Sequence, residues 1–370
     1  MEANPFFDED ESRSNGAALK SEMLPKIMSV GHLNNIVPII SNSFRIEQIF
    51  RTGKSLTEYV SKKPVHVDEE LTISEQLTRI WANKIHYPMP DDYKLWLVAQ
   101  YYQVHMIEAD TAKENYLTFL KRLLFEINED KEGYQEFVSA NRRTAHKMTF
   151  SAIAKGLDLP SLDGKADPLS LLAELPFPVY ITTSQYDFLE RAIERVSEGK
   201  RTPRTQVIFW EPNKDYPKAM EARHYPDPSF QPSPDEPAVY HLYGIENYPG
   251  SLVLSEDDYI RFLISVVSDH DTQNAIVPPK LRRIFSTAHL LLMGYRLRDW
   301  DFRVLFRVIQ HWRQNDSKMG ICIQLKPKTE DEKLLTYLRD YFNLRRFGIE
   351  WKSTVGFIRE LWELWQEQQQ

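Results

Sequence analysis

The sequence has little cysteine, no long apolar run and no excess of positive charge. Cys322 is the single cysteine among 370 residues, which excludes a disulfide framework and a zinc module built from paired CxxC motifs. No apolar run approaches the roughly 18–20 residues that a membrane-spanning helix needs. The first residues are acidic and polar, without the apolar segment of a secretory signal. The 46 basic and 53 acidic residues give a net charge of −7, so there is no overall basic footprint for nucleic acid. We therefore expect a cytoplasmic protein that binds neither a membrane nor nucleic acid directly.

Two nucleotide-binding motifs are also missing. No GxxxxGK[ST] sequence occurs, which excludes a P-loop ATPase. No GxGxxG follows the first predicted strand, where NAD-binding folds usually place the turn that holds the diphosphate. Ser41, Asn42 and Ser43 stand there instead; they can support a tight turn and donate hydrogen bonds, but they crowd a diphosphate more than glycine would. Arg45 could supply positive charge, or it could be an exposed helix residue.

Short apolar runs alternate with amphipathic helices over the second half of the chain. Strands are predicted at 34–41, 177–183, 205–211, 238–244, 288–294, 319–326 and 346–352. Between them lie helical patterns, among them one in which Ser255 and Asp258 have the spacing of a capping box. This alternation predicts an α/β protein with a doubly wound parallel sheet. Residues 68–150 carry helical patterns and no strand pattern, so we interpret them as a helical insertion.

Polar side chains follow three of the predicted strands, in TTSQYD, HLYG and GYRLRDWD. Because open parallel sheets bind ligands outside the carboxyl ends of their strands, these segments are candidates for one pocket. His241 at a strand end could act as a general base near neutral pH, although such a histidine is more often structural. Asp299 and Asp301 could accept hydrogen bonds from ribose hydroxyls, but these acids, like Asp187, also suit the amino terminus of a helix. No metal site is predicted, because the His-Asp pair at 270–271 has no second histidine four residues on.

The order of the motifs resembles that of sirtuin-like proteins of bacterial antiphage defence. In that family a VPFxGAGxS-like turn is followed by an AQYY-like helix, then TTNYDxxLE, then LHG with a DY helix, then GYSLxDxDxR. The corresponding segments here are VPIISNSFR at 37–45, VAQYYQ at 98–103, TTSQYDFLE at 182–190, HLYG at 241–244, LSEDDYIRFL at 254–263 and MGYRLRDWDFR at 293–303. The resemblance covers roughly residues 36–303, and the order of the motifs is more specific than any single one.

The resemblance implies a Rossmann-like, sirtuin-like fold that binds NAD and cleaves the nicotinamide–ribose bond. The family's catalytic histidine falls on His241 and its catalytic asparagine on Gln185. The chain departs from the pattern, because glutamine reaches one methylene further than asparagine and because HLYG has its histidine before the leucine. Aligning the histidines leaves Gly244 three residues on, where the family has glycine directly after histidine. The missing cysteine pairs argue against a zinc-dependent deacylase.

Composition and periodicity, together with the resemblance, give a division of the chain and a set of site residues. The segments are a flexible N-terminal part (1–30), the first part of the Rossmann-like domain (31–67), the helical insertion (68–150), the rest of the domain (151–353) and a C-terminal helix and tail (354–370). The predicted catalytic residues are His241 and Gln185. The predicted nucleotide-binding residues are Ser41, Asn42, Ser43, Arg45, Thr182, Thr183, Ser184, Tyr186, Asp187, Tyr243, Gly244, Gly294, Tyr295, Asp299 and Asp301.

The resemblance predicts one function and leaves one alternative open, in that order. The first is an NAD glycohydrolase that depletes NAD in infected cells, with NAD as substrate and no metal. The second is a catalytically weak or inactive nucleotide-binding subunit with a role in assembly, which the lost glycine turn and Gln185 favour. The family member most similar in length is paired with a HerA-type ring ATPase, so we expect a homo-oligomer that such a partner regulates. The last predicted helix has Phe357, Leu361, Leu364 and Trp365 near one face, either as core or as a contact surface.

Overall fold

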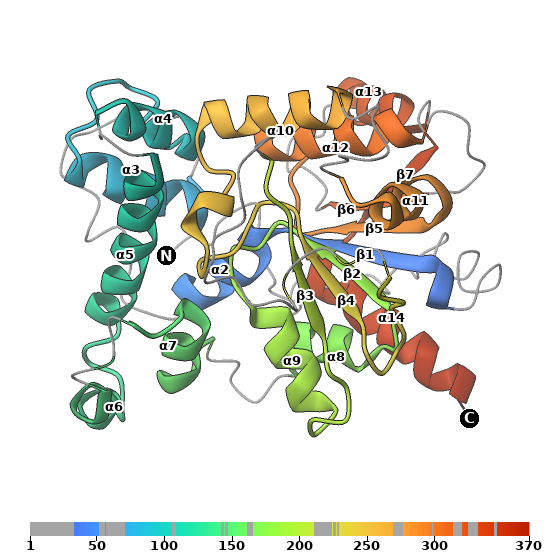
Figure 1. Cartoon of the computed structure of the whole chain (residues 1–370), viewed down its shortest axis with the longest axis horizontal. Coiled ribbons are helices and arrows are strands. Elements are labelled where there is room, and N and C mark those ends of the chain that lie inside the picture. Colours follow the sequence, from blue (N-terminus) through green and yellow to red (C-terminus); the bar gives the residue numbers. More distant parts are fainter. Residues whose placement is uncertain are drawn as a thin grey trace.

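A computed structural model gives the fold of the chain (Figure 1). It describes residues 33–51, 56, 71–105, 109–141, 144, 147–160, 166–210, 224, 227, 229–268, 277–297, 299–313, 320–324, 332–343 and 346–369. The predicted flexible segment at 1–30 and the His-Asp pair at 270–271 lie outside these residues. In the part of the chain that the structure describes, no helix is both long and apolar enough to cross a membrane.

The centre of the molecule is a seven-stranded parallel sheet with the strand order β3-β4-β2-β1-β5-β6-β7. The strands are β1 (Ile36–Ile40), β2 (Val179–Thr182), β3 (Arg204–Val207), β4 (Ala238–His241), β5 (His289–Met293), β6 (Gly320–Gln324) and β7 (Phe347–Trp351). Each strand coincides with one of the seven predicted apolar runs to within a few residues. The predicted α/β fold with a parallel, doubly wound sheet is therefore confirmed.

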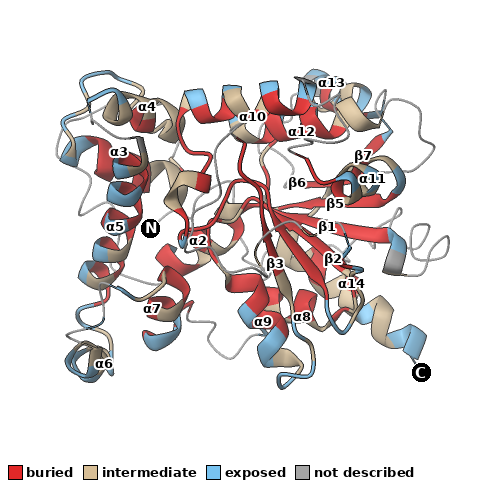
Figure 2. Ribbon diagram, viewed as in Figure 1, coloured by how far each residue is buried: buried red, intermediate tan, exposed pale blue. Residues whose placement is uncertain are grey.

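Helices cover both faces of the sheet (Figure 1). On one face lie α8 (Pro168–Glu174), α9 (Phe188–Val196) and α14 (Thr354–Gln369), and on the other α10 (Glu256–Ser268), α11 (Pro279–Thr287), α12 (Trp300–Trp312) and α13 (Glu332–Asn343). Because side chains alternate along a strand, β1 contributes to two separate cores. Ile36 and Ile40 join the core beneath α8, α9 and α14, whereas Val37 and Ile39 join the core beneath α10 to α13. The buried strands form the red centre of Figure 2.

A helical group lies beyond the carboxyl ends of the central strands (Figure 1). It consists of α3 (Ile73–Lys84), α4 (Leu95–His105), α5 (Ala109–Ile127), α6 (Tyr134–Asn141) and α7 (Phe150–Gly156). Thr72 and Glu75 form a capping box that fixes the start of α3, since each side chain accepts from the other residue's backbone N–H. Fully buried Trp81 joins α3 to the same core as β1, so these helices pack as part of the domain.

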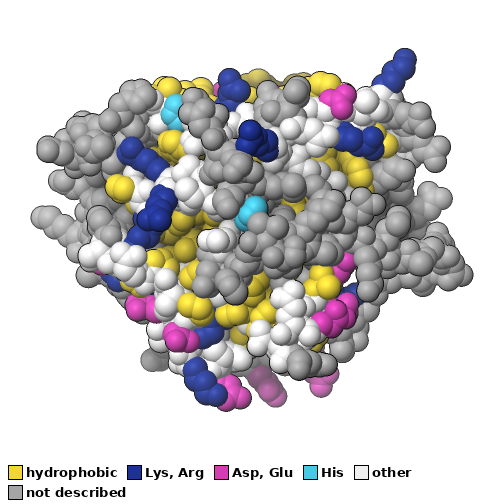
Figure 3. Space-filling view, turned by 90° about the vertical axis from the view of Figure 1, so that its right-hand side faces the viewer, with side chains coloured by type: hydrophobic (Ala, Val, Ile, Leu, Met, Phe, Trp, Pro, Cys, Tyr) yellow, Lys and Arg dark blue, Asp and Glu magenta, His cyan; other side chains and the backbone are white. Residues whose placement is uncertain are grey.

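The short connecting elements complete the chain. They are η1 (Leu33–Asn35) before β1, α2 (Asn42–Arg51) directly after β1, and η5 (Pro249–Ser251) before α10. The predicted capping box of α10 is present, because Ser255 N–H donates to Asp258 Oδ2 at 3.0 Å and Asp258 N–H donates to Ser255 Oγ at 3.3 Å. On the face shown in Figure 3, most of the described Lys and Arg side chains lie in the upper half of the view and most of the Asp and Glu side chains in the lower half.

The C-terminal helix packs into the core. Phe357 and Leu361 on α14 are fully buried, and Leu364 and Trp365 are partly buried against the same cluster. The Trp362 indole N–H donates to Glu174 on α8 at 2.6 Å. The apolar face that the sequence left open as core or contact surface is therefore mainly core.

Candidate functional site

A small cavity lies beside the carboxyl ends of the neighbouring strands β1 and β5. From β1 the sheet continues to β2 on one side and to β5 on the other, so the carboxyl ends of β1 and β5 mark the switch point where open α/β sheets bind ligands. The cavity measures about 50 Å³, and we call it the switch-point cavity. Its lining residues are Ser41, Ser43, Glu47, Thr72, Ser74, Glu75, Gly294, Tyr295, Arg296, Asp299 and Asp301. Six of these are predicted nucleotide-binding residues: Ser41, Ser43, Gly294, Tyr295, Asp299 and Asp301.

Gly294 allows the two strand ends to approach each other. Its φ is +76°, and a Cβ at this position would lie 2.8 Å from Cβ of Phe44 on α2. The Ser41 N–H donates to the carbonyl of Met293 at 3.0 Å, and the Gly294 N–H donates to Thr354 Oγ1 at 3.1 Å. A side chain at residue 294 would force β5 and α2 apart, so glycine is the residue that this approach requires.

The switch-point cavity has more carboxyl groups than basic groups in its lining. Arg296 faces Glu47 at 3.3 Å and Glu75 at 3.7 Å, while Asp299 and Asp301 complete the acidic side of the wall. Burial, reinforced by the neighbouring Asp301, raises the pKa of Asp299 to about 8. Burial also raises the pKa of Asp301. Burial therefore favours the neutral form of these acids, and a protonated carboxyl group can both donate and accept hydrogen bonds, which suits ribose hydroxyls.

The turn after β1 is already hydrogen-bonded within the protein. The Asn42 N–H donates to Thr183 Oγ1 at 3.2 Å, and the Ser43 N–H donates to Ser41 Oγ at 3.2 Å. Asn42 Oδ1 in turn accepts from the Gln185 N–H at 3.4 Å. Backbone N–H groups at the start of a helix are the usual diphosphate donors in nucleotide folds. Here two of those donors on α2 are bound by side chains, so a diphosphate would have to displace them.

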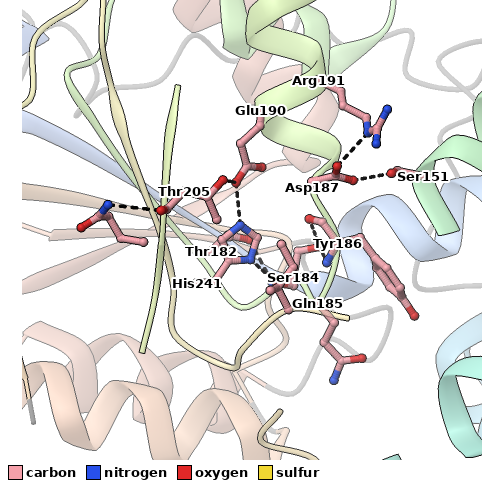
Figure 4. Close-up of polar contacts among 12 residues, drawn as sticks. Ser151, Thr182, Ser184, Gln185, Tyr186, Asp187, Glu190, Arg191, Thr205 and His241 are labelled. Atoms are coloured by element: carbon pink, nitrogen blue, oxygen red, sulfur yellow. Dashed lines mark hydrogen bonds and ion pairs between the residues drawn. The ribbon is translucent and has the colours of Figure 1, made fainter. Parts of the chain in front are cut away.

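His241 lies in a closed ion pair at the end of β4 (Figure 4). Its side chain is fully buried; Nε2 lies 2.8 Å from Glu190 Oε1 on α9, and Nδ1 lies 2.8 Å from the carbonyl of Ser184. Thr205 on β3 donates to the same Glu190 oxygen at 2.8 Å. Burial alone would lower the pKa of His241, but Glu190 outweighs burial and raises it. We call His241 and Glu190 the histidine pair. A general base needs a ring nitrogen within reach of the ligand, and here both nitrogens are engaged, so the catalytic role of His241 stays a prediction.

Gln185 lies on the segment that follows β2. Its side chain is 5% exposed, and its Oε1 is buried without a hydrogen-bond partner. In Figure 4 the amide points away from His241. A buried amide oxygen without a partner is costly, which is a common mark of a site that a ligand completes. The two predicted catalytic side chains therefore point in different directions.

The remaining residues of the TTSQYD segment hold the strand end together. Thr182 Oγ1 donates to the carbonyl of Ile40 and accepts from the Ser184 N–H, which ties β2 to β1. Thr183 Oγ1 contacts the Tyr295 hydroxyl at 3.2 Å. Tyr186 is buried against Phe150, with ring centroids 4.6 Å apart. These side chains are placed around the strand end rather than in the lining of the switch-point cavity.

Two predicted charged residues face elsewhere. The Arg45 guanidinium binds Asp167 at 2.8 Å, so the structure does not bring its charge to the switch-point cavity. Asp187 binds Arg191 at 2.8 Å and accepts a hydrogen bond from Ser151. Asp187 and Asp299 occupy the N-cap positions of α9 and α12 but make no side-chain capping hydrogen bond. The Asp301 carboxyl group instead accepts hydrogen bonds from backbone N–H groups at the start of α12, as the helix-start alternative predicts.

The comparison with protein families agrees with this architecture. Residues 178–344 match the SIR2-like domain. The match covers β2 to α13, including the ends of β2, β4 and β5 where the site residues lie. A SIR2-like domain indicates NAD-related chemistry. No curated protein matches the chain.

Gly244 offers a second way to align the histidine motif. Its φ is +76°, and a Cβ there would lie 2.3 Å from the carbonyl oxygen of Ser251, so only glycine fits. If Gly244 is taken as the glycine of LHG, the position of the family's histidine falls on Tyr243 rather than on His241. Tyr243 is buried and its hydroxyl donates to the carbonyl of Asp301 at 2.9 Å, next to the switch-point cavity.

Sequence reasoning did not identify three polar residues that shape the site. Glu190 is the partner of His241, Thr205 supports that pair from β3, and Arg296 is the cation of the switch-point cavity. Arg296 lies between Gly294 and Asp299, so its position in the last motif was an available signal. Glu190 ends the TTSQYDFLE segment, so it also lies within one of the motifs. Across the described residues, no group of three or more His, Cys, Asp or Glu side chains could hold a metal ion.

Proposed function

We propose that this chain is the catalytically weak or inactive subunit of a defence complex, with a nucleotide-binding fold and a role in assembly. The carrying observation is the histidine pair: His241 is fully buried, with one ring nitrogen on Glu190 and the other on the Ser184 carbonyl. A buried imidazole held at both nitrogens has no position from which to activate a ribose hydroxyl or water. The defence setting and the HerA-type ATPase partner rest on the resemblance in motif order.

The switch-point cavity supports the same proposal. Two amides of α2 are bound by side chains, and the acids outnumber Arg296. The lining therefore suits the hydroxyls of a ribose better than a diphosphate, and NAD itself would bind weakly unless α2 or α3 moves.

The second candidate is an NAD glycohydrolase. It is favoured by Gln185, whose buried Oε1 has no partner and whose amide could hold the nicotinamide or its ribose. In that case binding of the ATPase partner would shift the chain toward a conformation with an open site. A partner can raise activity only if it prefers the competent conformation.

Release of nicotinamide from NAD, measured by chromatography, separates the two candidates. The assay uses the chain alone and the chain mixed with a HerA-type ATPase, the proposed partner. We expect no release above the uncatalysed background in either sample. Steady release that depends on Gln185, in either sample, would overturn the inactive-subunit proposal and favour the glycohydrolase. Titration calorimetry with ADP-ribose and NAD provides a second readout, in which we expect weak binding of both.

A further inference from the structure

Helix α10 exposes apolar side chains beside a groove. Ile260, Ile264 and Val267 are 42%, 58% and 52% exposed, and their spacing places them on one side of the helix. Figure 2 shows exposed and buried positions alternating along α10 at the top of the molecule. The groove measures about 240 Å³ and lies between the second halves of α10 and α12. Its lining residues are Leu263, Val266, Val267, Arg307, Val308, Gln310 and His311. We call the groove and the three exposed side chains the α10–α12 surface.

The charged residues of the α10–α12 surface are basic. The described acids of both helices lie in their first turns, at Glu256, Asp257, Asp258 and Asp301. Beyond the first turns, every described charged residue of the two helices is basic, namely Arg261, Arg303, Arg307 and His311. Arg261 is paired with Asp258 at 3.6 Å, whereas Arg303 and Arg307 are exposed. In Figure 3, hydrophobic side chains reach the upper edge of the molecule, and Lys and Arg side chains lie close below them. The surface therefore suits an occupant that combines apolar side chains with negative charge.

Residues 5–11 of the same chain have this combination. Their sequence is PFFDEDE, in which two phenylalanines are followed by four acids. Phe6 and Phe7 are the only Phe, Tyr or Trp residues before Phe44, and the first 12 residues include no lysine or arginine. An apolar cavity of about 150 Å³ is enough to hold benzene, so the larger groove has room for a phenylalanine ring. The segment lies outside the part of the chain that the structure describes, and its sequence complements the α10–α12 surface in both apolar character and charge.

The topology places the attachment of this segment at the same edge of the sheet as the groove. Leu33 begins η1, directly before the amino end of β1. Helix α12 runs from the carboxyl end of β5 to the amino end of β6, so its second half lies at the edge where the parallel strands begin. In Figure 1, β1 begins and α12 ends on the right-hand side of the molecule. Residues 8–32 join Phe7 to Leu33, and a fully extended chain of that length spans about 90 Å. Because a compact chain of 370 residues has a radius of gyration of about 21 Å, Phe7 can reach the groove.

We propose that residues 5–11 bind the α10–α12 surface of their own chain, with the phenylalanines on its apolar side chains and the acids beside Arg307 and His311. Because the segment is tethered, its effective concentration at the surface is on the order of a millimolar, so even a weak contact is occupied. The bound segment covers Ile264 and Val267, which are exposed among the described residues. The groove lies at the opposite edge of the sheet from the switch-point cavity, so this inference does not depend on whether the chain binds or cleaves NAD.

Disulfide trapping in the full chain tests the contact. Cys322 is buried, so introduced cysteines react with little background. A chain with Asn4→Cys and Val267→Cys should form an intramolecular disulfide at least about tenfold faster than a chain with Asn4→Cys and Thr287→Cys. Thr287 is the matched control, because it is exposed at the end of α11, which leads to the amino end of β5 at the same edge of the sheet. Equal rates would overturn the proposal. A disulfide that joins two chains, identified by its mass, would also overturn it, because the occupant would then come from a second copy.

Further substitutions separate the apolar from the charged part of the contact. In the chain with Asn4→Cys and Val267→Cys, replacing both phenylalanines by serine should lower the rate of disulfide formation to that of the Thr287→Cys control. Arg307→Glu should lower it about threefold to tenfold, because it repels the acids of the segment. Arg283→Glu should leave the rate unchanged, since Arg283 is exposed on α11 and outside the groove lining. A rate that does not depend on the phenylalanines would contradict the proposed contact.

A fluorescent peptide of residues 1–14 gives a second readout that needs no cysteine. Fluorescence anisotropy compares its binding to the parent chain and to the chain in which Phe6 and Phe7 are both serine. The variant should bind the peptide about tenfold more tightly, because its own segment no longer competes for the surface. Circular dichroism checks that both chains are folded. Equal affinities, or no binding to either chain, would mean that a different molecule covers the surface, and the proposal would be wrong.

Discussion

The histidine pair and the switch-point cavity lie at the same edge of the sheet, but they differ in charge balance and in access. His241 and Glu190 form one buried pair with one cation and one anion, further fixed by Thr205 and the Ser184 carbonyl. The switch-point cavity instead sets several carboxyl groups around Arg296 and leaves space beside them.

The difference separates residues that stabilise the fold from residues that can meet a ligand. The histidine pair has few free hydrogen-bonding groups for a ligand, because its strongest hydrogen bonds are made within the protein. In the switch-point cavity the carboxyl groups outnumber the cations, and burial raises the pKa values of Asp299 and Asp301. Strongly shifted groups beside a cavity are typical of functional sites, so the switch-point cavity is the better candidate for ligand contact.

Removing one partner of the histidine pair should have the largest effect. Glu190→Ala leaves His241 buried without its carboxylate, and breaking a buried pair in this way typically costs about 3–5 kcal/mol of unfolding free energy. Glu194→Ala, on the same helix but exposed, should cost little. Chemical denaturation monitored by fluorescence measures both. A fully stable Glu190→Ala protein would mean that His241 does not need this partner, and would return it to consideration as a base.

Gly244→Ala should have the next largest effect. The added Cβ meets the backbone of Ser251, and alanine is also strained at φ +76°. Gly199 has the same φ with nothing within 4 Å of an added Cβ, so Gly199→Ala reports the strain alone. We expect the two variants to differ by on the order of 2 kcal/mol in unfolding free energy. Equal losses would remove the steric reason for aligning the LHG motif on Gly244.

Asp299→Asn should stabilise the protein, and more so at higher pH. The pKa of Asp299 is raised by burial from 3.8 to about 8, so the folded state favours the protonated acid. The unfolding free energy of the parent protein is therefore not reduced by this acid below the ordinary pKa of 3.8. It falls as the pH rises from there toward about 8, because the unfolded state ionises the acid and the folded state does not. Thermal melts should show the gain of the variant growing by on the order of 2 kcal/mol between about pH 5 and about pH 8.

Asp235→Asn, at an exposed acid, is the control for that series. It should show no such growth. A gain from Asp299→Asn that is the same at both pH values would contradict the assignment of Asp299 as a buried acid with a raised pKa.

Gln185→Ala should have the smallest effect on stability, within about 1 kcal/mol, because the Oε1 that it removes has no partner. Any binding of ADP-ribose or residual NAD cleavage should fall more than the stability does. Calorimetric titration and nicotinamide release measure the two effects on the same sample. Unchanged ligand binding in this variant would place Gln185 outside the site and leave the switch-point cavity as its centre.

Local patterns in the sequence predicted much of the fold. Most of the strands follow from short apolar runs, because a strand buried on both faces needs apolar residues at every position. The exception is β3, which has the sequence RTQV and ends where the predicted run becomes apolar. The capping box of α10 follows from the spacing of Ser255 and Asp258. Helices α8 and α11 are not among the predicted elements; they have seven and nine residues, which is short for a recognisable helical period.

The sequence by itself determined the parallel α/β architecture and the strand ends from which a site could be built, because both depend on spacing along the chain. Only the tertiary structure decided which polar groups meet. His241 and Glu190 are 51 positions apart, and Arg45 and Asp167 are 122 apart. No periodicity predicts such pairs, since each depends on how helices and strands far apart in sequence pack together. The same packing buried the face of α14 and exposed that of α10, although both helices have apolar residues at helical spacing.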